Sequence, residues 1–102
     1  MNRDPLIMAK VKSILGALTE MAPGHTVEVR VPPYSAIQCI EGPRHTRGTP
    51  PNVVEMSADS LIALIDGTSS WAELEGKGAI HASGERSNLS EIFLKLANRM
   101  RS

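Results

Sequence analysis

The residues best suited to bind a charged group lie in a short polar segment near the middle of the chain. Residues 44–49 read RHTRGT, which places two arginines around a histidine. An arginine guanidinium donates paired hydrogen bonds to two oxygens of a carboxylate or phosphate. The glycine lets a backbone approach such a group closely. We therefore expect Arg44, His45 and Arg47 to hold a polar or anionic group of a ligand.

The same arginines have a structural alternative. Arg44 and Arg47 could pair with the carboxylates of Glu41, Glu55 or Asp59 and attach their loop to the rest of the fold. If the arginines bind a ligand instead, a lipid head group or a phosphate of coenzyme A would fit them. The sequence leaves both interpretations open.

The other reactive residue types are scattered along the chain. His25, His45, His81 and Cys39 show no short metal-ligand spacing, so we expect no metal site. Cys39 shares a strand face with Ile37, which favours burial, and a nucleophile also needs an adjacent base. We expect no covalent catalysis and no cofactor.

Composition excludes several classes of function. The 102 residues carry 11 Lys+Arg against 11 Asp+Glu. A nucleic-acid-binding protein usually needs a basic surplus to displace counterions, so we expect no nucleic-acid partner. No apolar run approaches the roughly 18 residues of a membrane span, and the N-terminus has no long apolar core of a signal peptide. We expect one cytoplasmic domain over residues 1–102, without integral membrane association.

Aromatic residues are unusually few. The chain has only Tyr34, Trp71 and Phe93. Since aromatic rings supply large blocks of core area, Leu, Ile, Val, Met and Ala must build most of this core. A sheet lined by these smaller side chains leaves space for a ligand, or it makes a small compact core.

Apolar periodicity and capping residues define the expected elements. In chain order we expect first a helix from Pro5, with Asp4 as its N-cap, and then strands over 26–31 and 35–40. We next expect a loop over 42–51 with room for a short strand, a strand over 52–56, and a helix over 58–66 between Ser57 and Gly67. Last, we expect a short helix over 70–74, a strand over 79–83, and a helix opened by an Asn88–Glu91 capping pair. This order predicts an α+β domain, with helices covering one face of a mostly antiparallel sheet.

The C-terminal half then shows a family resemblance. Residues 59–67 read DSLIALIDG, 70–74 SWAEL, 76–85 GKGAIHASGE and 89–96 LSEIFLKL. In this order and spacing they resemble the C-terminal signature of the sterol carrier protein type 2 family. Residues 27–55, VEVRVPPYSAIQCIEGPRHTRGTPPNVVE, resemble its actinobacterial branch. The resemblance covers roughly residues 5–97.

The resemblance implies a five-stranded sheet covered by about four helices, with an apolar cavity between the two layers. It also implies non-enzymatic binding of a lipid or another apolar or amphipathic small molecule. The expected walls of that cavity are the apolar residues of the elements that would enclose it: Val54, Met56, Leu61, Leu64, Ile65, Trp71, Ile80, Phe93 and Leu96. A flexible methionine and a tryptophan with a polar N–H suit a pocket with an adaptable shape.

Two other classes of function stay open. The domain could be an interaction module that forms a homodimer or docks a partner through apolar surface. The resemblance adds a third, because relatives of this domain are fused to mycothiol-dependent isomerases. This chain could accordingly be an accessory domain in thiol-dependent metabolism.

Overall fold

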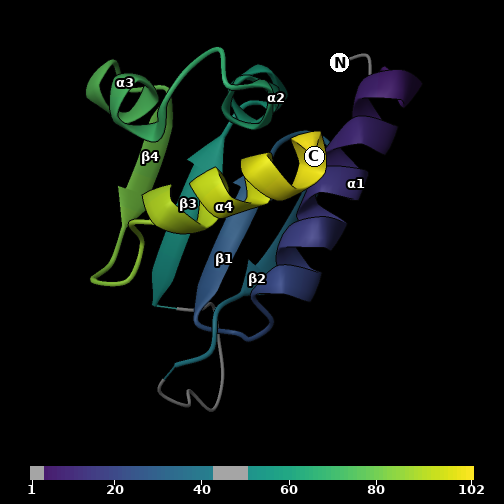
Figure 1. Ribbon diagram of the computed structural model, residues 1–102. Helices are drawn as coiled ribbons and strands as arrows, with labels where there is room; N and C mark the ends of the chain where they lie inside the picture. The colour runs from purple at the N-terminus through teal and green to yellow at the C-terminus, as the bar shows by residue number, and fades with distance from the viewer. Residues whose placement is uncertain (1–3, 43–50) are drawn as a thin grey trace.

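The computed structural model describes residues 4–42 and 51–102, and the predicted elements are present there in their predicted order (Figure 1). They are α1 (Pro5–Met21), β1 (Val27–Val31), β2 (Ser35–Cys39), β3 (Asn52–Met56), α2 (Ala58–Asp66), α3 (Trp71–Gly76), β4 (Ile80–Ser83) and α4 (Ser90–Arg101). The α+β class and the helices expected from the sequence are confirmed.

The strands form one sheet in the order β2-β1-β3-β4. The β1–β2 and β3–β4 pairs are antiparallel, whereas β1 and β3 run parallel. Val27 is the register partner of both Cys39, where β2 ends, and Asn52, where β3 begins. The chain therefore leaves β2 and enters β3 at the same end of the sheet, which makes β3 parallel to β1.

The expected strand count needs a correction. The described residues hold a sheet of four strands, not five. The loop in which a short additional strand was expected falls mostly on residues 43–50, which lie outside the described residues. The sheet remains mostly antiparallel, as expected, because two of its three pairs are antiparallel.

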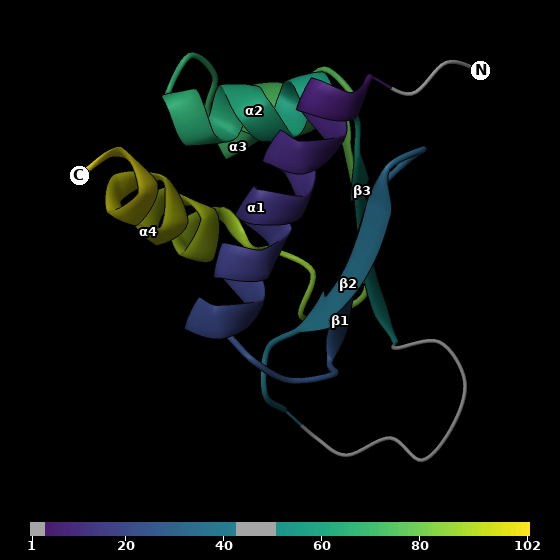
Figure 2. The same cartoon turned by 90° about the vertical axis from the view of Figure 1, so that its right-hand side faces the viewer.

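All four helices of the described chain gather on one face of the sheet (Figures 1 and 2). Alternate strand residues such as Val29 and Val54 face the helices and are fully buried. Their neighbours Glu28, Arg30 and Glu55 lie on the uncovered face, where Arg30 Nε donates to the Glu28 carboxylate. Antiparallel sheets commonly leave one face to solvent in this way.

Local capping sets the helix ends. The Asp4 carboxylate accepts from the Leu6 amide at 2.9 Å, and Ser57 Oγ accepts from the Ser60 amide at 3.1 Å. Gly67 ends α2 in the left-handed region, with φ 79°. These three caps are as predicted, because each depends only on residues within one helical turn.

The predicted Asn88–Glu91 capping pair is wrong. Helix α4 begins at Ser90, and Leu89 occupies its N-cap position without a side-chain hydrogen bond. The Asn88 side chain instead accepts from the Ser90 amide at 3.0 Å, a contact two residues along the chain. Leu89 itself is 2% exposed and belongs to the core.

A buried asparagine, Asn52 at the start of β3, connects the residue before β1 to the loop before α4. Asn52 Nδ2 donates to the Thr26 carbonyl at 3.0 Å, and its Oδ1 accepts from the Arg86 amide at 2.8 Å. Because buried amide groups are costly when unpaired, these bonds hold the loop in place. The loop leads directly into α4, which begins at Ser90.

Candidate functional site

An apolar pocket of about 480 Å³ opens between α2, α3 and α4. Its apolar lining residues are Leu64 of α2, Trp71 and Ala72 of α3, and Phe93, Leu94 and Ala97 of α4. Its other lining residues are Gly67, Ser69, Ser70, Glu73, Ser90 and Arg101. Apolar walls with a few polar groups, at this size, are typical of sites for small hydrophobic molecules.

Two aromatic rings form part of the wall. The centroids of the Trp71 and Phe93 rings are 5.8 Å apart, and their planes are inclined by 32°. Trp71 is 6% exposed and Phe93 is 1% exposed. Trp71 Nε1 is buried and has no hydrogen-bond partner among the described residues. One residue that lines the pocket therefore has an unused hydrogen-bond donor, although the donor atom itself is buried.

A capping box positions Trp71 at the first residue of α3. Ser70 Oγ accepts from the Glu73 amide at 3.1 Å, and Glu73 Oε1 accepts from the Ser70 amide at 3.0 Å. The hydrogen bonds from Ser70 hold the pKa of the Glu73 carboxyl below its ordinary value. Glu73 is thus a fixed negative charge at the rim near Trp71.

Arg101 joins the last turn of α4 to the end of α2. Its Nη1 donates to the Asp66 carbonyl at 3.4 Å, and its Nε donates to the Ala97 carbonyl at 3.3 Å. Its Nη2 donates to Asn98 Oδ1 at 3.3 Å. The guanidinium therefore satisfies carbonyl groups at two helix ends, where a positive charge also interacts favourably with the helix dipoles.

Leu94 lies at the outer rim of the pocket. It is 62% exposed, although it lines the pocket together with the buried Phe93. A single exposed leucine is ordinary on a protein surface. This one is noteworthy because it continues the apolar wall outward from the buried rings.

The structure brings three of the predicted wall residues to this pocket, namely Leu64, Trp71 and Phe93. The other six lie in the continuous core beneath it: Val54, Met56, Leu61, Ile65, Ile80 and Leu96. The predicted head-group residues Arg44, His45 and Arg47 lie outside the described residues. Whether any of these twelve residues binds a ligand stays a prediction.

Sequence reasoning missed one flank of α4. Ser90, Leu94, Ala97 and Arg101 all line the pocket and follow one another at intervals of three or four residues. That spacing places them on one side of a helix. The signal was therefore present, but the mixture of polar and apolar types concealed it.

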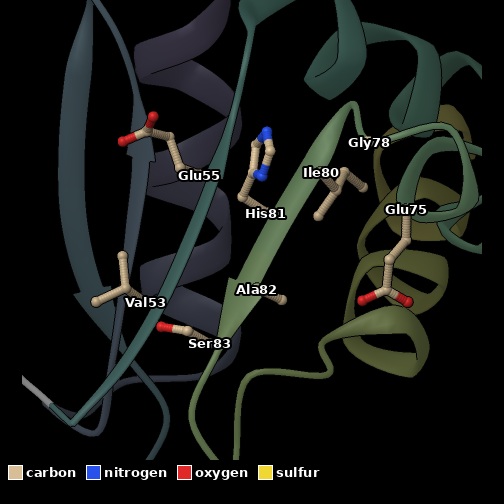
Figure 3. Close-up of a pocket in the computed structure, with 8 residues that line it drawn as sticks. All are labelled: Val53, Glu55, Glu75, Gly78, Ile80, His81, Ala82 and Ser83. Carbon is tan, nitrogen blue, oxygen red and sulfur yellow. The ribbon is translucent and has the colours of Figure 1, made fainter.

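A second pocket, of about 560 Å³, lies around the edge strand β4 (Figure 3). Glu55 and His81 are register partners there, and Ser83 follows on the same face. No side-chain hydrogen bond joins these three residues. The described part of this pocket therefore holds no assembled pair of nucleophile and base. Its lining combines apolar Val53, Ile80 and Ala82 with polar side chains, and it is more open to solvent than the pocket between the helices.

The remaining reactive groups show no further site in the described residues. Cys39 is fully buried, and its burial raises the pKa of the thiol to about 11. The described residues hold no group of three or more His, Cys, Asp or Glu side chains that could bind a metal ion. They also contain no helix of the length and apolarity required to cross a membrane.

The helix-covered sheet and the apolar pocket define a domain with the fold of sterol carrier protein type 2. The chain belongs to the bacterial SCP ortholog family, whose model matches residues 2–94. The predicted sterol-carrier family is therefore confirmed, while its actinobacterial branch stays a prediction.

One similar solved structure is that of the UbiJ-SCP2 ubiquinone synthesis protein. The similarity covers 99% of this chain and 96% of that chain, with a TM-score of 0.53 and 19% sequence identity. At this identity the likeness shows the shared fold. No curated protein matches the chain.

Proposed function

We propose that the protein binds a hydrophobic or amphipathic small molecule of the lipid class, without covalent chemistry, in the pocket between α2, α3 and α4. The observation that carries this proposal is the opening of buried apolar walls, including Trp71 and Phe93, at the surface beside exposed Leu94. Membership of the bacterial SCP ortholog family supports it. So does the fold shared with a protein whose name refers to ubiquinone synthesis.

The lining residues divide into three roles. Leu64, Trp71 and Phe93 contact the apolar body of the ligand from three different helices. Leu94 extends that contact toward the rim. Beneath them, the buried residues of the predicted cavity wall hold the helices against the sheet and keep the pocket in shape.

Binding without catalysis is consistent with the chemistry of the described residues. The buried Cys39 thiol has its pKa raised to about 11, so it is a poor nucleophile at neutral pH. The His81 side chain is exposed and lies on the sheet face opposite the helix pocket. Neither residue lines that pocket.

The test compares two exposed leucines with the same substitution. Leu94→Glu places a charge at the pocket rim, whereas Leu6→Glu changes an 83% exposed leucine at the start of α1, outside the pocket. The probe is a fatty acid with an anthroyloxy fluorophore, titrated into each purified protein. Leu94→Glu should weaken binding by about tenfold, which is ~1.4 kcal/mol for lost apolar contact and a nearby charge.

Leu6→Glu should leave the affinity unchanged. Equal affinities for the two variants would show that the probe binds elsewhere. Absence of binding to the unmodified protein, together with no lipid in the native mass spectrum of the purified chain, would reject the proposed function.

A further inference from the structure

We propose that the ligand of the helix pocket carries an uncharged acceptor oxygen, such as a ketone or quinone carbonyl, and that this oxygen receives the indole N–H of Trp71. The inference rests on the proposed function. It narrows the ligand class from lipids in general to neutral apolar molecules with a carbonyl group.

The hydrogen-bond donor is the indole N–H of Trp71. Trp71 lines the pocket, and its Nε1 atom is buried without a hydrogen-bond partner among the described residues. An indole N–H can only donate. Since nearly all buried polar groups in native proteins have a partner, an unused donor on a residue that lines the pocket indicates that the ligand supplies an acceptor once it reaches the ring.

The oxygens at the pocket rim already accept hydrogen bonds from groups other than Trp71. Ser70 Oγ and Glu73 Oε1 accept from each other's amides in the capping box. The Asp66 and Ala97 carbonyls accept from Arg101. These rim acceptors are engaged in holding helix ends, and none of them accepts from Trp71.

Two charged side chains, Glu73 and Arg101, line the pocket. Glu73 lines the pocket two residues after Trp71, and its carboxylate would repel an anionic group placed beside the indole. Arg101 lines the pocket too, and its positive charge opposes that of Glu73, so the two rim charges together favour neither sign of ligand charge. An ionised ligand group would also lose solvation between apolar walls. A neutral carbonyl oxygen supplies the acceptor that the indole lacks without the solvation cost of an ionised group.

The indole N–H does not contact solvent, so the ligand must move part of the pocket wall to reach it. Changes of side-chain rotamer on binding are common, even where the backbone moves little. We therefore expect the Trp71 ring to shift when the ligand enters. Its contact partner Phe93 should shift with it.

The experiment uses the full chain labelled with ¹⁵N and two probes of nearly the same shape. In 2-decanone the carbonyl oxygen is the acceptor, and in 2-methyl-1-decene a CH₂ group replaces that oxygen. Because the chain has a single tryptophan, its spectrum contains one indole cross-peak. We expect 2-decanone to move the indole proton downfield, as a new hydrogen bond does, and the alkene to leave it without that shift.

A second protein separates the hydrogen bond from the shape of the pocket. Replacing Trp71 by β-(3-benzothienyl)alanine substitutes sulfur for the N–H group and keeps the bicyclic ring. This replacement should weaken 2-decanone binding about 3- to 10-fold, the range for one net hydrogen bond, and leave alkene binding unchanged. Decanoate should bind the unmodified protein more weakly than 2-decanone does.

The outcomes are distinguishable. If both neutral probes bind and the sulfur replacement affects them equally, the carbonyl inference is wrong and the proposed function stands. Tighter binding of decanoate would overturn the neutral-ligand inference in the same way. If neither neutral probe binds while the anthroyloxy fatty acid does, the carbonyl inference is wrong and the proposed function stands. If the anthroyloxy fatty acid also fails to bind and no lipid co-purifies, both fail.

Discussion

Trp71 and Phe93 lie in contact, with ring centroids 5.8 Å apart and planes inclined by 32°. The two residues are 22 positions apart and belong to different helices, α3 and α4. Their contact is a direct link between the short α3 and the rest of the helical layer. It also forms the buried end of the apolar pocket wall.

We expect Phe93→Ala to destabilise the protein by about 3–5 kcal/mol, because it removes a fully buried ring and leaves a cavity. Urea unfolding followed by circular dichroism measures the change. Tryptophan emission should also move to longer wavelength, since Trp71 loses its neighbour. The control is Leu94→Ala at the next, 62% exposed position, which should change stability by less than about 0.5 kcal/mol. Similar losses in both variants would contradict the packing described for Phe93.

A close backbone approach makes Gly24 sensitive to substitution. Its φ is 144°, and a Cβ atom at this position would overlap the Ile40 carbonyl group. Gly24→Ala should therefore lower the free energy of unfolding by at least about 3 kcal/mol. Gly16→Ala is the matched control at an exposed position of α1, where a Cβ would meet no atom within 4 Å. That change should stabilise the protein by about 0.5–1 kcal/mol, and a loss there would contradict the helical environment of Gly16.

The capping box predicts an acid-dependent contribution from Glu73. Its pKa is lowered in the folded protein, so the folded state favours the ionised carboxylate. The resulting stability is present above the ordinary pKa of 4.5 and is lost as pH falls through the lower folded value. In urea unfolding from pH 7 to pH 3, the stability advantage of the unmodified protein over Glu73→Gln should therefore shrink below about pH 4.5.

Glu75→Gln is the control for that series, since it removes the same charge from α3 without touching the capping box. Its stability difference from the unmodified protein should vary less over this pH range. If the Glu73 and Glu75 variants showed the same pH profile, the capping hydrogen bonds would have no part in the effect.

Burial predicts an unreactive thiol at Cys39. At pH 8, alkylation of the folded protein by iodoacetamide should be slower than in 8 M urea by at least about 100-fold, because the folded thiol has its pKa raised to about 11 and is inaccessible. Mass spectrometry of quenched samples measures both rates. Comparable rates in folded and unfolded protein would mean that β2 opens readily.

The sequence predicted those features that depend on neighbouring residues. Asp4, Ser57 and Gly67 cap their helices as expected, because a cap is completed within one turn. The alternation in β1 correctly placed Val29 inside and Glu28 outside, since successive strand residues point to opposite faces. The order of elements also predicted the α+β class.

Features that depend on distant contacts were predicted less well. The capping pair at Asn88 was wrong, since α4 begins at Ser90 and the N-cap position is held by Leu89, a core residue that no capping pattern predicts. The parallel β1–β3 pair follows from where the chain re-enters the sheet, at Asn52 beside Val27. No local pattern of residue types encodes that register.

The sequence by itself determined which segments form the helices and strands, apart from the strand count and the start of α4, and it determined their buried faces and the family to which the chain belongs. Only the tertiary structure decided that α2, α3 and α4 leave a pocket between them, and that Leu64, Trp71 and Phe93 line it while Leu61 and Leu96 fill the core. The physical reason is that periodicity identifies the apolar side of each helix. Whether that side is covered depends on the angle and spacing of its neighbours, which many long-range contacts set together.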